Sequence, residues 1–464
     1  MTGKANAQSA GDLDAQPPPQ APPPPTSRAA PGWTRWLRAH RTELVLFAVS
    51  YLVLACFSSQ RFLRQSAAPH FVYQAKAWLE GRMDIAQDVL PNPEDWACVR
   101  EVSGEKTRCR PPVQPTDTFY VSFPDFPAVV MLPFVAVNGY QFNDTSFGVF
   151  VGALAITLFF SLLQLLSALG ESERSRNENL VLALVLGFGT LFFYCAIRGE
   201  VWFSAQVMGV ALTCLYLRFA VRARRPLWAG ILFSMAVLTR APLVFTGVFF
   251  LAEALCPERG HRLAQLKSAL REPKRWLKPL GLFAAGMAPL AIAAAVYNHV
   301  RFGGLADFGH NFLFNNRVNA DIDTYGLFNL HYLARNLQAA FLLLPRLSLH
   351  PLQLGYSPYG LSLFLTLPIL VLLFTPKEKR RLDVALWLSV AVCALPGLLY
   401  QNTGYMQFGF RFSLDYTVYL LLLFALGGWS LKNRGVQALL VLGVLVNVWG
   451  AVAFHGYTEY VRHW

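Results

Sequence analysis

The stretch APHFVYQAKAWLEGRMDI, residues 68–85, lies in a polar segment that separates the first apolar run of the chain from all the later ones. Phe71, Ala75 and Trp78 recur in it at helical spacing, and polar residues alternate with them. This pattern predicts an amphipathic helix at a membrane surface that ends near Gly81. The alternative is a helix that packs on the surface and has no further role.

The stretch YVSFPDFPAVVMLP, residues 120–133, closes the same polar segment. It belongs to the apolar run 121–138, which Pro124, Pro127 and Pro133 interrupt. Because proline breaks the helical hydrogen-bond ladder, we expect helices that lie at the outer surface of the membrane or dip into it, and not a full crossing.

The composition of the whole chain indicates a membrane protein. Of its 464 residues, 54% are hydrophobic and only 14% are charged, which is too apolar for a soluble domain of this size. The net charge of +13 comes from short basic clusters between apolar runs, as in loops that are held at the cytoplasmic face. The charge pattern therefore excludes nucleic acid as a partner.

Apolar runs of membrane-crossing length recur along the chain, since a crossing helix needs about 20 apolar residues. Together with an interrupted segment at 226–255, they predict an all-α integral membrane protein, a bundle of about 9–11 membrane segments with extracytoplasmic juxtamembrane helices. The nine clear runs are 43–59, 146–168, 180–197, 201–220, 279–297, 352–375, 384–400, 414–430 and 436–455.

The N-terminal segment, residues 1–40, is rich in proline, alanine and glutamine and is predicted to be a disordered tail. Arg35, Arg38 and Arg41 precede the first span, so the positive-inside rule places this tail in the cytoplasm. Residues 41–464 are predicted to form one polytopic domain in a bacterial inner membrane.

With residues 121–138 at the membrane surface, the two long polar loops 58–145 and 298–350 are extracytoplasmic. A crossing at 121–138 would place the basic cluster from Arg222 to Arg225 outside, against the positive-inside rule. In the preferred topology nearly all aspartates fall in outer loops or at outer span ends. We therefore expect extracytoplasmic chemistry.

The segment 226–255 is apolar, carries basic clusters at both ends and is interrupted by TRAP at residues 239–242. If both flanks are cytoplasmic, it enters the membrane and returns as two short helices that turn near Arg240 and Pro242. A charged residue at that depth usually faces a protein-lined cavity. The alternative is one long kinked helix, which would invert the topology of all later spans.

Cys98 and Cys109 share the first outer loop, whereas the other five cysteines lie within apolar runs or at the end of one. In an oxidising compartment the pair forms a disulfide, and two unpaired thiols are the alternative. The sequence leaves both open.

Five motifs along the chain carry a resemblance to a known family. They are HFVYQAKAWLEGRMD (70–84), FPDFPAVVMLP (123–133), GILFSMAVLTRAP (230–242), NHVRFGGLADFGH (298–310) and QFGFRFSLDY (407–416). Together they resemble the C-type glycosyltransferase superfamily (GT-C), integral membrane enzymes that use polyprenyl-phosphate sugars and include protein mannosyltransferase and arabinose transferase types. The resemblance covers roughly Arg41 to Arg434.

The resemblance implies a mechanism at the outer face. A sugar is presented on a polyprenyl phosphate, a carboxylate near the start of the first loop takes a proton from the acceptor hydroxyl, and basic groups hold the phosphate. The acceptor is a lipid, a glycan or a protein. Some members of the superfamily also use a divalent cation, although this sequence has no ligand cluster with metal spacing and no glycine-rich loop for a nucleotide.

The position where the superfamily carries its acidic residue holds AAPH, residues 67–70, in this chain. His70 titrates in the range of a general base, and Asp84 and Asp125 are further acids of the same loop. These three are the predicted catalytic residues. The alternatives are a structural histidine at a helix start and two solvated cap or turn residues.

Arg240, Arg301 and Arg411 are the predicted ligands of the donor phosphate, because a planar guanidinium matches phosphate geometry. Arg411 stands one helical turn before Asp415, so a mutual structural ion pair is the alternative. The predicted supporting residues are Glu200, Asp307, His310 and Asp415. For Glu200, a local ion pair with Arg198 is the alternative.

The sequence thus predicts a membrane glycosyltransferase that uses a polyprenyl-phosphate sugar at the extracytoplasmic face. One alternative is a transporter or flippase of lipid-linked intermediates, for which an intramembrane arginine and a broken hairpin are also natural. Another is a catalytically silent member of the superfamily. The large first outer loop and the lack of two-half symmetry favour the enzyme.

Overall fold

A computed structural model describes residues 32–90, 96–258, 262–314, 316–349, 352–355 and 357–456. The chain forms two compact units, residues 1–42 and 43–464. Most of the predicted disordered tail lies outside the described residues. Its last part was predicted wrongly, because α1 (Gly32–Ala39) is a helix.

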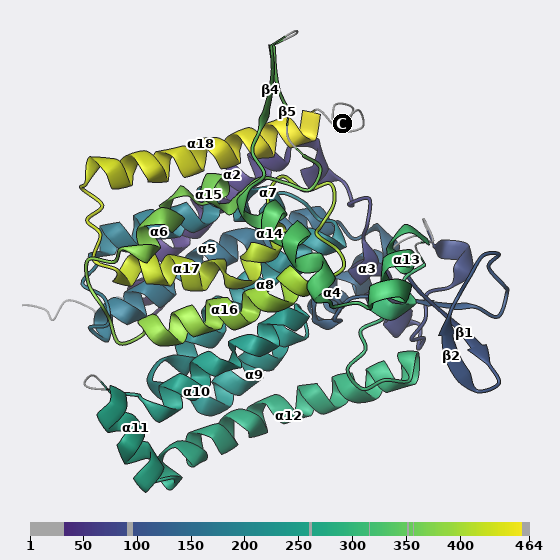
Figure 1. The fold of residues 1–464 in the computed structure, drawn as a ribbon, viewed down its shortest axis with the longest axis horizontal. Helices are drawn as coiled ribbons and strands as arrows, with labels where there is room; N and C mark the ends of the chain where they lie inside the picture. Colours follow the sequence, from purple (N-terminus) through teal and green to yellow (C-terminus); the bar gives the residue numbers. More distant parts are fainter. Residues whose placement is uncertain are drawn as a thin grey trace, which may run out of the picture. The chain divides into compact units, whose positions relative to one another are not determined.

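The second unit is a helix bundle, which confirms the predicted all-α membrane class (Figure 1). Among the described residues, five helices are long and apolar enough to cross a membrane, where a helix satisfies its own backbone hydrogen bonds. They are α2 (Arg41–Ser58), α5 (Asp144–Ala168), α8 (Val201–Ala220), α12 (Lys274–Phe302) and α18 (Arg434–Gly456).

The other helices are shorter, and several come from runs that were predicted as single spans. Residues 180–197 belong to two helices, because the first helix ends before Gly189 and a new one begins at Phe192. The shorter helices are α3 (His70–Leu79), α4 (Phe126–Asn138), α6 (Arg176–Phe188), α7 (Phe192–Ala196), α9 (Pro226–Val237), α10 (Gly247–Leu255), α11 (Arg262–Arg271), α13 (Asn316–Tyr325), α14 (Leu333–Phe341), α15 (Leu363–Thr366), α16 (Asp383–Leu399) and α17 (Leu414–Leu426).

The core of the bundle surrounds α17, in which every residue is buried. It packs against α16, α8 and α6. A helix that is apolar all round has no face for water, so burial on every side is its stable location.

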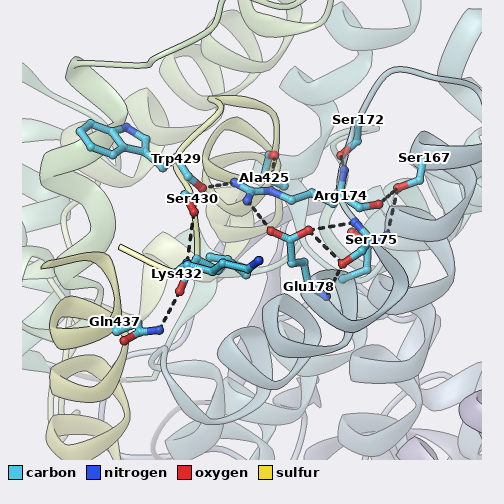
Figure 2. A network of polar contacts seen from close by, with 12 residues as sticks. Ser167, Ser172, Arg174, Ser175, Glu178, Ala425, Trp429, Ser430, Lys432 and Gln437 are labelled. Carbon is cyan, nitrogen blue, oxygen red and sulfur yellow. Dashed lines mark hydrogen bonds and ion pairs between the residues drawn. The ribbon is translucent and has the colours of Figure 1, made fainter. Parts of the chain in front are cut away.

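A network of polar contacts fixes the end of α17 (Figure 2). Arg174, between α5 and α6, donates to the backbone carbonyls of Ala425 at 3.0 Å and Trp429 at 2.6 Å. It also donates to Glu178, which closes a capping box with Ser175 at the start of α6. The bond to Ala425 satisfies a carbonyl that the last turn of α17 leaves without a partner, and the bond to Trp429 holds the segment that follows the helix.

The predicted hairpin of two short helices is present in residues 226–255. Helix α9 ends before Arg240, the 3-10 turn η5 (Ala241–Thr246) follows, and α10 leads the chain back. The backbone N–H of Arg222, before the segment, donates to the carboxylate of Glu253 near its end at 2.6 Å. Both ends of the segment therefore lie at the same end of the bundle.

Two glycines bring α9 and α12 into close contact. A Cβ atom at Gly230 would lie 2.0 Å from the carbonyl oxygen of Phe283, and one at Gly286 would lie 2.2 Å from that of Leu227. Only glycine permits such an approach of two backbones, which is a common way of packing helices in membranes. The long helix α12 is thereby attached along α9.

The predicted first outer loop, residues 58–145, contains helices α3 and α4 at the positions where surface helices were predicted, and a sheet that was not predicted. Helix α3 ends at Leu79, two residues before Gly81, whose φ of +72° suits glycine, and α4 packs against α3. Between them lies an antiparallel sheet of order β2-β1-β3, formed by β1 (Ala97–Val102), β2 (Glu105–Arg108) and β3 (Thr118–Tyr120).

The prediction of a span over residues 352–375 was wrong. Its first residues form β5 (Leu352–Gly355), which pairs antiparallel with β4 (Arg346–Leu349), and Figure 1 shows this hairpin projecting away from the helices. The rest forms α15 and the turn η8 (Pro368–Phe374). Glycine and proline at Gly355, Pro358 and Gly360 stop a helix from starting earlier.

Candidate functional site

A cavity of about 1250 Å³ lies between the hairpin turn, α12, α16 and the start of α17. The segment after α12 and a few residues of the first outer loop complete its wall. The lining is mainly apolar and aromatic. The structure brings five predicted site residues together there: Arg240, Asp307, His310, Arg411 and Asp415.

Arg240 forms a two-pronged ion pair with Asp415. Its Nε donates to Oδ1 at 2.9 Å and its Nη2 to Oδ2 at 2.7 Å, and both side chains are largely buried. Arg240 reaches this position because α9 stops before Pro242, while Asp415 lies in the first turn of α17. Two parallel bonds of this kind fix orientation as well as charge.

Arg411 lines the same cavity, is only 6% exposed, and forms no ion pair with a carboxylate of the described residues. Its guanidinium carbon lies 5.2 Å from the ring centre of Phe412 and 5.7 Å from that of Phe203. The alternative of a mutual pair with Asp415 is not what the structure shows, because Asp415 pairs with Arg240. One positive charge of the wall is thus left without a counterion.

A row of aromatic rings connects the arginines to His310. The ring of His310 lies 6.2 Å from that of Tyr400, and Tyr400 lies 6.0 Å from Phe412. Phe412 in turn lies 5.9 Å from the guanidinium carbon of Arg240. On its other side His310 lies 5.7 Å from Phe123 of the first outer loop.

The segment that follows α12 carries two titratable side chains, those of Asp307 and His310. Burial lowers the pKa of His310 to about 4; Asp307 opposes this shift and the positive charge of Arg240 adds to it. The imidazole is therefore neutral near pH 7. The carboxylate of Asp307 accepts hydrogen bonds from the backbone N–H of Gly309 at 2.7 Å and from Asn311 at 2.9 Å.

Arg301 does not line the cavity. It is fully buried and donates to Asp125 at 2.8 Å and to Asn298 at 2.8 Å, while its guanidinium carbon lies 3.9 Å from the ring centre of Tyr297. The hydroxyl of Tyr297 accepts hydrogen bonds from Gln74 and Trp78 of α3. This cluster joins the first outer loop to α12.

Asp125, at the start of α4, is occupied by Arg301 and also lies off the cavity lining. Burial raises the pKa of its carboxyl to about 6, although Arg301 opposes the shift. The predicted roles of Asp125 in catalysis and of Arg301 in phosphate binding stay predictions.

His70 is buried and stacks on Trp96, with ring centres 4.0 Å apart and planes 11° apart. Burial lowers its pKa to about 4. Neither His70 nor Asp84 lines the cavity, but the rings of two lining residues, Phe123 and Trp202, each lie 6.2 Å from that of His70. Their catalytic roles stay predictions as well.

Glu200 lies in the tight turn before α8 and is also absent from the cavity lining. Its carboxylate pairs with Arg198 at 3.1 Å and with Arg61 at 3.7 Å. The local pair proposed as the alternative is therefore present.

Cys98 and Cys109 are bonded, which decides between the two alternatives for this pair. The bond joins β1 to the residue after β2. Among the described residues, one group of three side chains has the spacing of metal ligands, but it consists of these two cysteines and Asp117, which pairs with Arg100 at 2.7 Å. The sulfurs are thus unavailable to a metal ion.

No protein-family model matches the chain, and no curated protein matches it. Among solved structures, the chain is similar to the Archaeoglobus fulgidus oligosaccharyltransferase. The crystal structure with a tethered acceptor peptide containing the NVT sequon is 13% identical, with a TM-score of 0.43, over 90% of this chain and 55% of that one. The crystal structure of the apo form is 14% identical, with a TM-score of 0.44, over 89% and 55%.

A third structure, archaeal oligosaccharyltransferase AglB from the same organism in complex with an inhibitory peptide and a dolichol-phosphate, is 11% identical, with a TM-score of 0.43, over 90% and 56%. The chain spans about half the length of these proteins. All three structures are of an archaeal oligosaccharyltransferase. The function is argued below from the cavity.

Proposed function

We propose that the chain is a membrane glycosyltransferase that moves a sugar from a polyprenyl-phosphate donor to a lipid, glycan or protein acceptor at the extracytoplasmic face. The observation that carries the proposal is Arg411, a buried cation in the cavity wall that has no carboxylate partner among the described residues. Holding an unpaired charge out of water costs several kcal/mol, so an anionic ligand is the natural partner for it. A phosphate group suits the planar guanidinium.

The apolar lining supports a lipid carrier for that phosphate. Ala291, Ala294 and Ala295 of α12 line the cavity, and their small side chains leave room for an isoprenoid chain. An apolar wall beside a cationic end matches a prenyl phosphate, whose two parts differ in the same way.

In the proposed reaction the acceptor oxygen attacks the anomeric carbon while the bond from that carbon to the phosphate oxygen breaks. The phosphate leaves with the bonding electron pair, and Arg411 stabilises its growing negative charge. His310, neutral near pH 7 and in the same cavity, takes the proton of the acceptor hydroxyl. Asp307 favours the protonated imidazole, because its negative charge acts on His310.

Sugar transfer in proteoliposomes that contain a polyprenyl-phosphate sugar tests the proposal. We expect Arg411→Ala and His310→Ala each to lower transfer by roughly 100-fold or more, in line with the loss of an electrostatic or acid–base group. The matched control is Arg271→Ala, since Arg271 is an exposed cation of α11 away from the cavity. Unchanged transfer in the Arg411 and His310 variants would contradict the proposal.

A flippase of lipid-linked intermediates is the second candidate, and the broken hairpin at Arg240 favours it. The same proteoliposomes separate the two functions. Movement of the donor lipid between leaflets with no transfer product would support the flippase. Donor binding with neither transfer nor movement would support a catalytically silent protein.

A further inference from the structure

Arg240, Arg411 and Asp415 line one part of the cavity, which we call its anion end. This end has two guanidinium groups but only one carboxylate among the described residues. Arg240 is neutralised by Asp415, whereas Arg411 is not neutralised by a carboxylate of the described residues. This end therefore carries one net positive charge. Cys393, Tyr400 and Tyr416, which also line the cavity, are uncharged near pH 7.

The remaining charged or titratable lining groups are Asp307 and His310. Both belong to the segment after α12, where the carboxylate of Asp307 acts on His310. Asp307 forms no ion pair with Arg240 or Arg411. The charge of the anion end is thus set by the two arginines and Asp415.

The structure holds the Arg240–Asp415 pair in place from several sides. The stem of Arg240 runs past Gly209 of α8, where a Cβ atom would lie 3.0 Å from its Cγ. The thiol of Cys393 on α16 lies 3.7 Å from the backbone carbonyl of Asp415. Two of the five guanidinium N–H donors are used by the carboxylate, so Arg240 still has donors for a ligand but adds no net charge.

Lipid carriers of sugars differ in the charge of the group that links the sugar to the lipid. A sugar linked through one phosphate is a phosphodiester with one negative charge, whereas a sugar linked through a diphosphate carries two. A buried site with one positive charge neutralises the first and leaves the second with an uncompensated charge, which is costly in an apolar cavity.

We propose that Asp415 is a specificity-determining residue. By neutralising Arg240, it limits the anion site to one positive charge and selects donors linked through a single phosphate over donors linked through a diphosphate. This inference rests on the proposed function, because it takes the anion of the cavity to be the head group of a lipid carrier.

The test measures equilibrium binding of two probes to the full chain in detergent, by calorimetry: methyl farnesyl phosphate, with one negative charge, and methyl farnesyl diphosphate, with two. We expect the wild type to bind the monophosphate at least tenfold more tightly. Asp415→Asn, which frees the charge of Arg240, should reduce this ratio at least tenfold or reverse it. Asp415→Glu should restore it.

Two further variants serve as controls. Asp323→Asn removes an exposed carboxylate that does not line the cavity and should leave the ratio unchanged. The double variant Arg240→Met with Asp415→Leu removes both charges, keeps one net positive charge and should retain the preference for the monophosphate. It also keeps the test valid if Asp415→Asn does not fold.

The outcomes separate the inference from the proposed function. Equal binding of both probes by the wild type, or an unchanged ratio in Asp415→Asn, would overturn the role of Asp415 and leave the phosphate site standing. Binding of neither probe by the wild type would overturn the phosphate site, and with it the proposed function and this inference.

Discussion

Arg411 and Arg301 are two buried arginines that differ in one respect: within the described part of the chain, Arg301 has a carboxylate partner and Arg411 has none. We expect Arg411→Met to raise the melting temperature in detergent, since it removes an unpaired buried charge, and to weaken binding of methyl farnesyl phosphate roughly 10- to 100-fold. Arg301→Met should lower the stability by about 3–5 kcal/mol, because it leaves Asp125 buried without a counterion. A loss of stability in Arg411→Met would show that Arg411 is structural.

One buried histidine, His70, and one partly buried histidine, His310, make the fold sensitive to acid. Burial lowers the pKa of both His70 and His310 to about 4, below the value near 6.5 of an unfolded chain. Protons therefore bind the unfolded state more readily, so the stability contribution of neutral histidine is present above pH 6.5 and is lost as the pH falls towards 4. For His70 this amounts to about 3 kcal/mol.

The variant His70→Phe keeps a ring that can stack on Trp96 but cannot take a proton. Melting curves between pH 4 and 7.5 should show a smaller loss of stability at low pH than in the wild type. His331→Phe is the matched control, because His331 also stacks on an aromatic ring, that of Tyr325, but is exposed. An acid-side decline in His70→Phe as steep as in the wild type would refute this assignment.

The sequence pointed to several cavity residues for a physical reason. Arg240 and Arg411 interrupt or flank apolar runs, and a charge at such a position needs a protein-lined environment. The pairing of Arg240 with Asp415, 175 positions apart, depends on how the hairpin and α17 both pack against α8 and α16, and it has no local signal in the sequence. His70 was selected for its place in a motif, and its burial under Trp96 depends on a fold that the motif does not describe.

At the scale of elements, the contact between α9 and α12 depends on glycine. We expect Gly286→Leu to push the helices apart and to lower both the melting temperature and the binding of methyl farnesyl phosphate, because overpacking of this kind costs about 1–3 kcal/mol or more. Gly281→Leu is the matched control on the same helix, since a Cβ atom there meets nothing within 4 Å. Equal behaviour of the two variants would argue against a tight glycine contact.

The elements themselves were predictable to different degrees. The hairpin 226–255 followed from basic residues at both ends, a constraint that acts over the whole segment. The strands β1 to β3 were missed because their residues lie in a polar loop and show no apolar periodicity. Sheet pairing and the disulfide hold them together, and neither leaves a periodic signal in the sequence. β5 was missed because an apolar run of this length has the same composition in a strand and in a helix.

For the molecule as a whole, the disulfide between Cys98 and Cys109 agrees with an extracytoplasmic first loop, because such bonds persist in oxidising compartments. We expect a membrane-impermeant maleimide to label Glu101→Cys in intact cells but not Lys267→Cys, and to label the latter after permeabilisation. Both positions are exposed. The reverse pattern would invert the topology.

The long helix α12 lines the cavity with three alanines, yet only 11% of its most apolar window is buried within the protein. In the predicted membrane location, most of its surface meets the hydrocarbon phase, the same phase in which a prenyl donor dissolves. Encounter between such a donor and the proposed enzyme is a search in two dimensions. Saturation of the enzyme with donor then depends on the mole fraction of donor among the lipids. Added lipid without donor should lower the turnover of each enzyme molecule, whereas added buffer should leave the turnover unchanged.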